Sequence, residues 1–594
     1  MVFEKEITLA ILEAFKSRFN ADIEPEKVSI QPTRKEFEGS HTFVVFPFLK
    51  VTKKGPEDSG REIGTYLVEN SDLVTSFNTV KGFLNLTLAK SKWLALFAQA
   101  YDQQAFGRAV PNGKKVMVEF SSPNTNKPLH LGHLRNNFLG DSVSRILEAA
   151  GYEVLKTNLV NDRGIHICKS MLAYQEFGTG ETPESSGIKG DHLVGKYYVV
   201  FDQHYKMEVE ELVRQGKSEE EAKKEAPLIL AAQEMLIKWE EKDPEVYGLW
   251  EKMNGWVYEG FNATYESMGI SFDKIYKESD TYLLGKDIVD EGLEKKVFFK
   301  KDNNSVWVDL SQEKLDEKLV LRGDGTSVYI TQDMGTCDLK YGDFPFDQSV
   351  YVVGNEQDYH FKVLFSIMGK LGRPYSEGLY HLSYGMVDLP SGKMKSREGT
   401  VVDADDLIQE MKETAESHTR ELGKIEGMNE QEAHQLYDML ALGALKYFLL
   451  KVDPRKRMLF NPAESIEFQG HTGPFVQYTH ARISSILRRG KTLEYKPTVK
   501  DSAIEVQARE MEVIQKLMEF PEVVQTAAAE YSPSLIAQYV FDLAKEYNGF
   551  YQDIPIFNEK DRSLVEYRMA LSALTARVLD TGMGLLGIEV PERM

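Results

Sequence analysis

Residues 115–160 follow the order strand, loop, helix, strand, and this order restricts the fold strongly. The apolar run KVMVEF (115–120) is typical of a buried strand. Apolar residues then recur at near-helical spacing from Leu131 until Gly151, a residue typical of a helix end, and the run VLKTNLV (154–160) predicts a second strand. Two strands of one sheet that are joined by a helix run parallel, so these residues predict a βαβ unit and a parallel sheet.

The remaining segments predict a multidomain α/β protein. Residues 1–110 combine an amphipathic helix with short strand-like runs and predict a small α+β domain. Residues 111–405 contain the parallel-sheet unit and are interrupted at about 175–270 by a charged, helical and exposed insertion. Leucine-rich helical patterns then predict a stem over 406–465 and an α-helical bundle over 466–594.

Three further runs predict that the parallel sheet resumes after the insertion. They are SVWVDL (305–310), SVYITQD (327–333) and SVYVVG (349–354). Each is rich in β-branched and aromatic residues, which are typical of strands. We therefore expect all three to be strands of the sheet, which would extend to about residue 405.

Composition and charge bear on possible partners, on metal sites and on whether the chain is secreted or spans a membrane. The 594 residues carry a formal net charge of -21, an average too coarse to support or exclude a nucleic-acid partner. The two cysteines, Cys168 and Cys337, are far apart and lack CxxC spacing, so a cysteine-based zinc site is excluded and a reduced, cytoplasmic setting is expected. The N-terminus lacks a signal-peptide pattern, and no apolar stretch reaches the roughly 18 residues that a membrane span needs.

The motif His130-Leu131-Gly132-His133 stands where the loop after the first predicted strand enters the helix. Two imidazoles beside free backbone N–H groups, at the positive end of the helix dipole, predict a site for a polyphosphate. Gly132 has no Cβ, so a flat adenine ring can approach the backbone there. Two alternatives stay open: ordinary histidines at a helix start, and a zinc site, which the lack of a nearby cysteine or second histidine pair disfavours.

A second motif, KMKSR (393–397), lies in a loop with glycine on each side. Mobile lysines between glycines suit a flap that closes on phosphates as negative charge develops. Alone, such a run is more often a solvated basic turn. Paired with HLGH it becomes specific, and the pair predicts that Lys393 and Lys395 act on phosphates together with His130 and His133.

Both motifs are similar to those of a known family. HLGH resembles the HIGH signature, and KMKSR the KMSKS signature, of class I aminoacyl-tRNA synthetases, and the longer run SSPNTNKPLHLGHLRNNFLGD (121–141) resembles the arginyl enzymes. The resemblance implies a Rossmann-like catalytic domain in which the carboxylate of L-arginine attacks the α-phosphorus of Mg·ATP and pyrophosphate leaves. Mg²⁺ would arrive with ATP, and no protein-bound zinc is implied. The implied ATP-binding residues are Gly132, His130, His133, His360, Lys393 and Met394.

The second motif departs from the family pattern at one position. KMSKS has a lysine at its fourth position, whereas this chain has Ser396 there. Many arginyl enzymes lack that lysine, and a lysine three residues before the first histidine of the HIGH motif, here Lys127, is thought to compensate. Lys395 is the other candidate, and the sequence leaves both open as catalytic residues.

The substrate side of the site is implied by further matches. A guanidinium needs a planar, acidic pocket because its five N–H donors form a fixed fork. Tyr329 and Asp333 match the family's Y-x-T-x-D, and Gln357 lies in a match to VVG-x-x-Q-x-x-HF. The resemblance assigns these residues and Asn124 of the SPN run to contacts with arginine. Glu278 resembles the acidic residue that completes the pocket.

The two ends of the chain imply a tRNA partner. EFQGHTGPFVQYTHAR (467–482) resembles the segment that opens the family's α-helical anticodon-binding domain, and residues 1–110 resemble the domain that recognises the tRNA D-loop. The implied protein is a monomeric arginine–tRNA ligase that charges tRNA(Arg). The alternatives are a class I enzyme of another specificity and a small-molecule HxGH nucleotidyltransferase, which needs no tRNA-binding parts. NDRG (161–164) departs from the family's common GDWG.

Overall fold

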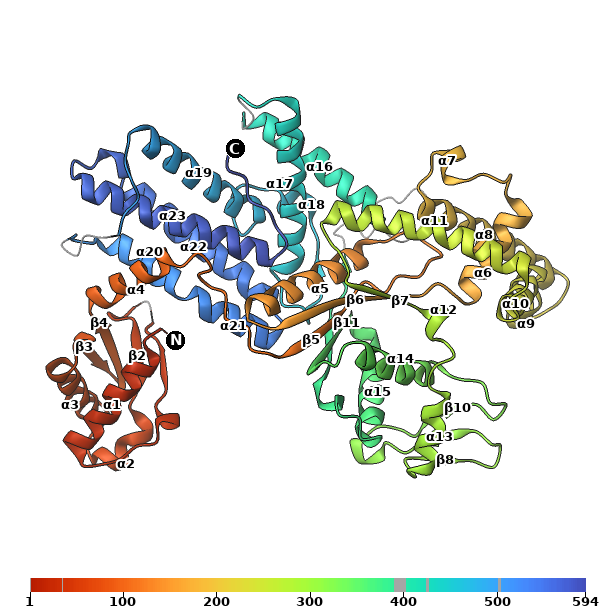
Figure 1. Cartoon of the computed structure of the whole chain (residues 1–594), viewed down its shortest axis with the longest axis horizontal. Coiled ribbons are helices and arrows are strands. Elements are labelled where there is room, and N and C mark those ends of the chain that lie inside the picture. Colours follow the sequence, from red (N-terminus) through yellow and green to blue (C-terminus); the bar gives the residue numbers. More distant parts are fainter. Residues whose placement is uncertain (1, 35, 389–401, 424–426, 500–503) are drawn as a thin grey trace.

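The structure is a computed structural model that describes residues 2–34, 36–388, 402–423, 427–499 and 504–594. Figure 1 shows a central sheet with a large helical C-terminal part on one side and a helical arm on the other. The N-terminal domain lies below the C-terminal helices, and a smaller lobe lies beneath the sheet. Within the described ranges, no helix has both the length and the apolar character that a membrane crossing needs.

The N-terminal domain is a four-stranded antiparallel sheet of order β1-β2-β4-β3 with helices packed against it. Helix α1 (Glu4–Phe19) buries Ile7, Ile11 and Phe15, because residues at this spacing lie on one face of a helix. The other elements are β1 (Ile30–Pro32), β2 (His41–Val44), α2 (Leu49–Thr52), α3 (Pro56–Asn70), β3 (Val74–Val80), β4 (Phe83–Leu88) and the following α4 (Lys90–Asp102).

A five-stranded parallel sheet of order β12-β11-β5-β6-β7 forms the centre of the molecule. The predicted βαβ unit is confirmed, because α5 (Leu131–Ala149) joins β5 to β6 and these strands pair in parallel. Val116, Met117 and Val118 of β5 are fully buried, as expected of a strand covered on both faces. The strands are β5 (Lys115–Glu119), β6 (Glu153–Val160), β7 (Lys274–Lys277), β11 (Gln348–Gly354) and β12 (Leu379–Tyr384).

Helix α5, which begins with the HLGH motif, is fixed closely to its surroundings. A Cβ at Gly140 would lie 2.1 Å from the ring of Phe120, so only glycine permits this approach of the helix to the chain that follows β5. The Arg135 side chain is fully buried and donates hydrogen bonds of 3.0 Å to the carbonyls of Pro454 and Lys456. Burial lowers the pKa of Arg135 to about 10. Its guanidinium therefore fastens α5 to residues 454–456 of the C-terminal part.

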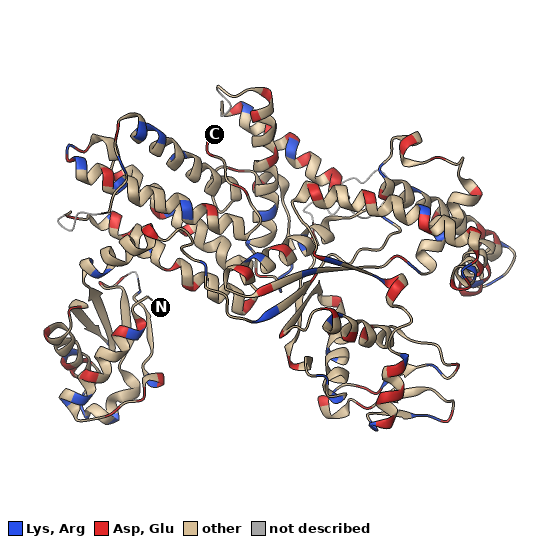
Figure 2. Cartoon of the chain, viewed as in Figure 1, with Lys and Arg blue, Asp and Glu red and all other residues tan. Residues whose placement is uncertain are grey.

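The insertion is helical, as predicted, and its helices pack on one another at the right of Figure 1. Trp256 and Phe261 of α11 are buried, so the insertion has an apolar core as well as a solvated face. Figure 2 shows acidic residues gathered at its outer end, around α9. Helix α6 (Ile165–Phe177) precedes the insertion, whose elements are α7 (Pro183–Ser186), α8 (Gly190–Arg214), α9 (Glu219–Glu225), α10 (Pro227–Glu240) and α11 (Pro244–Met268).

Two of the three runs expected in the parallel sheet lie elsewhere. Val306–Val308 forms β9 of a separate antiparallel sheet, of order β10-β9-β8. SVYITQD begins helix α14 (Tyr329–Asp343), so the strand prediction is wrong there. Ile330, Met334 and Cys337 are buried at helical spacing. Two of these residues follow the short run used for the prediction, so the run alone did not reveal the helical period. This region also contains α12 (Glu278–Thr281), α13 (Lys286–Glu294), β8 (Phe298–Lys300), β10 (Lys318–Leu321) and α15 (Asp358–Lys370).

The C-terminal part consists mainly of long helices, as predicted. The last residues run back along α19, where Gln477 and Arg488 each donate a 2.8 Å hydrogen bond, to the carbonyls of Glu589 and Glu592. The elements are β13 (Val387–Asp388), α16 (Ala404–Glu421), α17 (Glu430–Leu450), β14 (Met458–Leu459), α18 (Pro462–Ser465), α19 (Gly473–Thr492), α20 (Ala508–Met518), α21 (Phe520–Glu530), α22 (Pro533–Asp553) and α23 (Arg562–Leu585).

Both cysteines are free thiols in the interior. Cys168 lies on α6 and Cys337 on α14, and each side chain is 2% exposed. Burial raises the pKa of both thiols to about 12. They are therefore inert core residues, because the reactive form of cysteine is the thiolate.

Candidate active site

Three strands of the central sheet carry predicted site residues just beyond their carboxyl ends. The loop after β5 contains Asn124 and Lys127, β7 is followed by Glu278, and β11 by Gln357 and His360. β11, β5, β6 and β7 are consecutive in the sheet, so these segments begin from one edge. Ligands of open parallel sheets bind outside the carboxyl ends of the strands. The topology therefore explains how residues far apart in the chain come to one edge.

The two histidines of HLGH form a hydrogen-bonded cap on helix α5. His130 is the N-cap residue, and its Nδ1 accepts a hydrogen bond of 3.1 Å from the N–H of Gly132. Nδ1 of His133 accepts one of 3.1 Å from the N–H of His130, and the ring centroids lie 4.0 Å apart. A Cβ at residue 132 would lie 2.9 Å from Cε1 of His130. Glycine at this position is therefore what lets the His130 ring fold back onto the helix.

This cap fixes the protonation of both rings. Because each Nδ1 accepts a hydrogen bond, the proton of the neutral imidazole is on Nε2, which remains able to donate. Burial and the charge of Lys127 lower the pKa of His130 to about 4. Burial, with the charges of His130 and Lys127, lowers the pKa of His133 well below its usual value. At neutral pH the histidines are thus uncharged donors, and Lys127 is the cation beside them.

One part of the prediction for HLGH is wrong: the first backbone N–H groups of α5 are not free. The N–H of Leu131 donates to the carbonyl of Val402 at 3.0 Å, and that of His133 to the carbonyl of His130 at 2.8 Å. The N–H of Gly132 is held by the His130 ring. The sequence gives no sign of the Val402 contact, because that residue lies far along the chain. Among the described residues, Nε2 of the two histidines and the ammonium of Lys127 remain as donors for a phosphate.

Acidic residues gather on the other side of this sheet edge. Oδ2 of Asp333, on α14, accepts a hydrogen bond of 2.7 Å from Nε2 of His360, on α15. Burial, with the negative charges of Asp162 and Asp333, raises the pKa of Glu278 against the opposing charge of Arg163. Several carboxylates thus lie near one another, an arrangement suited to a cationic ligand such as a guanidinium.

The other predicted substrate residues are more open. Tyr329 begins α14 one turn before Asp333 and is 77% exposed. Asn124 and Gln357 are also exposed, and the backbone of Asn124 forms a parallel bridge with Asn161, just beyond the end of β6. The structure therefore brings Asp333, Glu278 and His360 together. Among the residues that the structure describes, no enclosing wall covers Tyr329, Asn124 and Gln357.

Sequence reasoning missed the residue that supports Glu278. The Asp162 side chain is fully buried, and its carboxylate accepts hydrogen bonds from the hydroxyl of Tyr258 at 2.7 Å and from the N–H and hydroxyl of Ser279 at 2.9 and 2.8 Å. Asp162 therefore fixes the start of α12, where Glu278 is the first residue. The available signal was an aspartate just after a buried strand, within the NDRG run that departs from the family pattern.

The KMKSR motif lies outside the described residues, and so do Lys393, Met394 and Lys395. The chain is described again from Val402. There Asp403, the N-cap residue of α16, forms an antiparallel bridge with His130. The chain that follows the second motif is thus joined directly to the first residue of HLGH.

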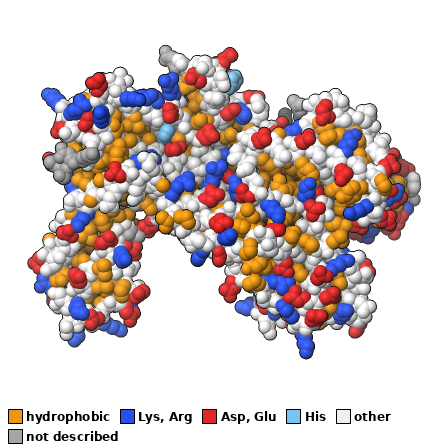
Figure 3. Space-filling view, in the orientation of Figure 1, with side chains coloured by type: hydrophobic (Ala, Val, Ile, Leu, Met, Phe, Trp, Pro, Cys, Tyr) orange, Lys and Arg blue, Asp and Glu red, His pale blue; other side chains and the backbone are white. Residues whose placement is uncertain are grey.

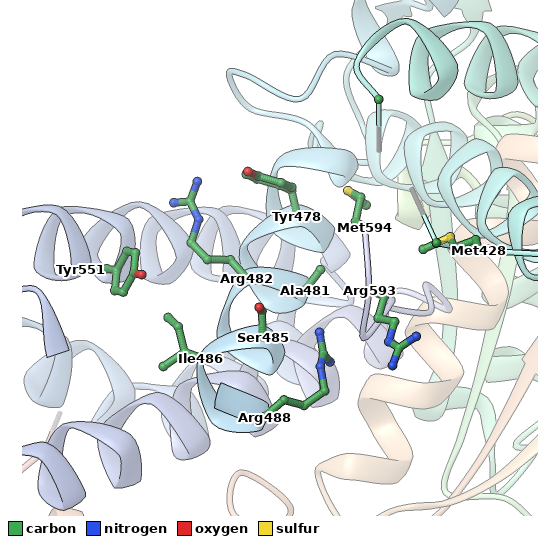
Figure 4. A pocket seen from close by; sticks show the side chains of 12 residues that line it. Met428, Tyr478, Ala481, Arg482, Ser485, Ile486, Arg488, Tyr551, Arg593 and Met594 are labelled. Atoms are coloured by element: carbon green, nitrogen blue, oxygen red, sulfur yellow. The ribbon is translucent and has the colours of Figure 1, made fainter. Parts of the chain in front are cut away.

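A cavity of about 590 Å³ lies in the C-terminal part, away from this sheet edge. Figure 4 shows its basic and aromatic lining, which includes Arg482, Arg488, Arg593, Tyr478 and Met594. The guanidinium of Arg482 lies over the ring of Tyr478, 4.9 Å from its centroid. Figure 3 shows basic side chains gathered on the surface at this end of the molecule. Arginine and aromatic side chains together are typical of surfaces that bind single-stranded nucleic acid.

Comparisons with known proteins agree with this architecture. The family model described as tRNA synthetases class I (R), catalytic domain, matches residues 97–461, and that of the DALR anticodon binding domain matches residues 476–594. The arginine–tRNA ligase of Amoebophilus asiaticus is 59% identical over 587 residues, 98% of each chain. That of Phocaeicola vulgatus is 56% identical, with both chains covered completely.

Solved structures give the same result. The arginyl-tRNA synthetase of Thermus thermophilus superposes with a TM-score of 0.78 at 25% identity, and each chain is covered completely. The enzyme of Plasmodium falciparum has the same fold, with a TM-score of 0.76 at 19% identity. These matches confirm the predicted multidomain α/β fold and disfavour the nucleotidyltransferase alternative. The chain therefore belongs to the arginyl-tRNA synthetase family, the class I ligases that attach arginine to tRNA.

Proposed function

We propose that the edge of the central sheet activates L-arginine with Mg·ATP and that the same site then transfers arginine to the 3′ end of tRNA(Arg), with release of AMP. This proposal rests on one observation: two kinds of chemical group lie on opposite sides of the same edge of the central sheet. Neutral histidine donors and Lys127 lie on the β5 side, and a cluster of carboxylates lies around Asp333. The first set suits a triphosphate and the second a guanidinium.

On the nucleotide side, Nε2 of His130 and of His133 would donate hydrogen bonds to ATP, while Lys127 would offset the charge that develops on the phosphates. Donors that are already oriented gain strength as charge builds up in the transition state. Mg²⁺ enters as part of the substrate Mg·ATP and neutralises phosphate charge. No protein nucleophile is needed, because the arginine carboxylate itself attacks the α-phosphorus and pyrophosphate leaves.

On the amino-acid side, Asp333 and Glu278 would pair with the guanidinium of arginine. The hydrogen bond from His360 fixes the orientation of the Asp333 carboxylate, so His360 would have a positioning role beside the ATP contact expected from the sequence. Tyr329, Asn124 and Gln357 would close over the substrate from the exposed side, because all three are exposed in the described part of the chain.

The expected result of a charging assay is that the protein, with ATP and bulk tRNA, forms an ester with arginine and with no other amino acid. Twenty parallel reactions, each with one radiolabelled amino acid, measure acid-precipitable label on tRNA. Reactions without ATP serve as controls. Charging with a different amino acid would refute arginine specificity, and charging without ATP would refute the adenylate route.

The basic cavity of the C-terminal part is proposed to bind the anticodon loop of tRNA(Arg). Its lining residues Arg482, Arg488 and Arg593 lie within the match to the DALR anticodon binding domain. Together with the sheet edge, one chain then contains both the reaction site and an anticodon site, which is consistent with a monomer. Reduced, buried cysteines are consistent with the cytoplasm.

Replacing Arg593 by alanine is expected to raise KM for tRNA roughly tenfold and to lower the salt dependence of tRNA binding, because one phosphate contact is lost. Arg593 is exposed in the cavity, so its removal leaves the helix packing intact. Charging rates at varied tRNA and salt concentrations give both quantities. The matched control is Lys206→Ala, on the exposed surface of the insertion. Equal KM values for the two variants would argue against the cavity as a tRNA site.

A further inference from the structure

A polar cluster outside the predicted site joins the helical insertion to the start of α16. Lys189, the N-cap residue of α8, places its Nζ 2.6 Å from Oδ2 of Asp405 and 3.3 Å from Oδ2 of Asp191. Nε2 of His192 donates to Oδ2 of Asp405 at 3.0 Å. The hydroxyl of Thr264, on α11, donates to the other oxygen of Asp405 at 3.0 Å. Two helices of the insertion thus hold one carboxylate of α16.

The cluster has the residue types of a metal site, but an ammonium group supplies the cation. Ligand atoms of Asp191, His192 and Asp405 lie within 4.8 Å of one another, and Lys189 contacts both carboxylates. Burial alone would lower the pKa of His192, but its hydrogen bond to Asp405 and the nearby carboxylates outweigh burial and raise it. Hydrogen bonds from His192 and Lys189 likewise overcome burial and lower the pKa of Asp405 to about 2. These residues form an ion-pair network.

The network reaches the HLGH motif through Asp403. Oδ1 of Asp403 accepts a hydrogen bond of 2.8 Å from the N–H of Asp405, and its Oδ2 lies 3.6 Å from Nε2 of His192. The backbone of Asp403 forms the antiparallel bridge with His130, and hydrogen bonds of 3.0 Å flank the bridge on both sides. The N-cap residues of α16 and α5 are therefore held against each other, and the insertion holds one of them.

Helix α8 also contacts the loop that carries Lys127. A Cβ at Gly195 of α8 would lie 2.9 Å from Cδ of Pro128 and 3.6 Å from Cα of Lys127. The insertion is thus packed against the same loop at a second point. A shift of α8 relative to α16 would act on both ends of the segment from Lys127 to His130.

We propose that Lys189 and His192 are positioning residues for adenylate formation, which hold the backbone of His130 in place through Asp405 and Asp403. Neither side chain contacts the histidine rings, so their effect is on geometry. A displacement of about 1 Å in a reacting group can cost roughly 100-fold in rate. This inference rests on the proposed role of His130 in adenylate formation.

The test is arginine-dependent ATP–pyrophosphate exchange, measured with tRNA present. For Lys189→Met we expect kcat to fall roughly 10- to 100-fold, with KM for arginine within about twofold of the original value, because the acidic pocket lies on other elements. Lys189→Arg, which keeps the charge, should retain most of the rate. Lys189→Met combined with Asp405→Asn should recover part of the loss, because it removes a partly buried negative charge that has lost its ammonium partner.

Lys206→Met is the matched control, because Lys206 lies on the same helix and pairs at 2.6 Å with exposed Asp202. Thermal unfolding measured by circular dichroism verifies that each variant is folded at the assay temperature. An unchanged kcat in Lys189→Met, a rise in KM alone, or equal losses in Lys189→Met and Lys189→Arg would overturn the proposal. His130→Ala distinguishes failure of the proposed function from failure of this inference. Full activity of His130→Ala would refute the role of His130 in adenylate formation. An inactive His130→Ala together with a fully active Lys189→Met would refute only the positioning role of Lys189.

Discussion

Replacement of Lys127 by methionine is expected to lower kcat for arginyl-adenylate formation roughly 100- to 1,000-fold and to change KM for arginine by less than about threefold. The reason is the protonation state of the site. His130 and His133 are neutral because burial and the charge of Lys127 lower their pKa values. Lys127 then supplies positive charge that the histidines lack, and its contact with the phosphates strengthens in the transition state.

The same variant has a second, spectroscopic readout. Without the Lys127 charge, the pKa of His130 should rise from about 4, which NMR titration of the imidazole can follow. Lys300→Met, at an exposed lysine of β8, is the control for loss of one positive charge. Lys395→Met, tested in parallel, separates the two candidates for the missing lysine of the second motif. If Lys127→Met kept its rate and Lys395→Met lost it, the assignment of Lys127 would be wrong.

Replacement of Asp333 by asparagine is expected to lower kcat/KM for arginine roughly 10- to 100-fold, mainly through KM for arginine. A hydrogen bond to a charged group contributes about 1.5–3 kcal/mol, and the amide removes the charge while keeping the shape. The hydrogen bond of Asp333 to His360 shows that its carboxylate is oriented before substrate binds. Steady-state pyrophosphate exchange at varied arginine concentration measures the change.

Competition by citrulline, an uncharged analogue of arginine, tests whether Asp333 recognises the charge of the substrate. If Asp333 recognises the positive charge, Asp333→Asn should reduce the preference for arginine over citrulline as a competing ligand. KM for ATP should stay within about twofold, because the nucleotide groups lie on other elements. Asp316→Asn, at an exposed position of the small lobe, is the control. A variant that lost affinity for both amino acids equally would indicate a general effect on the pocket.

The sequence predicted the parts of the fold that depend on local periodicity. The unit of β5, α5 and β6 is confirmed. It could be predicted because each element carries its own local pattern, either a buried apolar run or a helical spacing of apolar residues. SVYITQD failed for the opposite reason. Seven residues were too few to distinguish a strand from the first turns of α14, whose buried residues Met334 and Cys337 lie beyond the end of the run.

The candidate site was predictable only where the chemistry is local. HLGH at a helix start is a short pattern, and the structure confirms its position at the N-terminus of α5. The contact of Asp403 with His130 joins residues far apart in the chain, so no periodicity signals it. The burial of Asp162 is likewise a property of packing around α11 and α12. The roles of the site residues stay predictions, which the variants above test, and the domain boundaries stay predictions as well.

The two interior thiols have a practical consequence for fluorescence experiments. Maleimide dyes react with thiolates, and Cys168 and Cys337 are both buried with pKa values raised to about 12. A single new cysteine at an exposed position, such as Lys206→Cys on α8, should therefore be labelled selectively without removal of the native pair. Energy transfer from that dye to a labelled tRNA would then report directly on how the insertion approaches the bound nucleic acid.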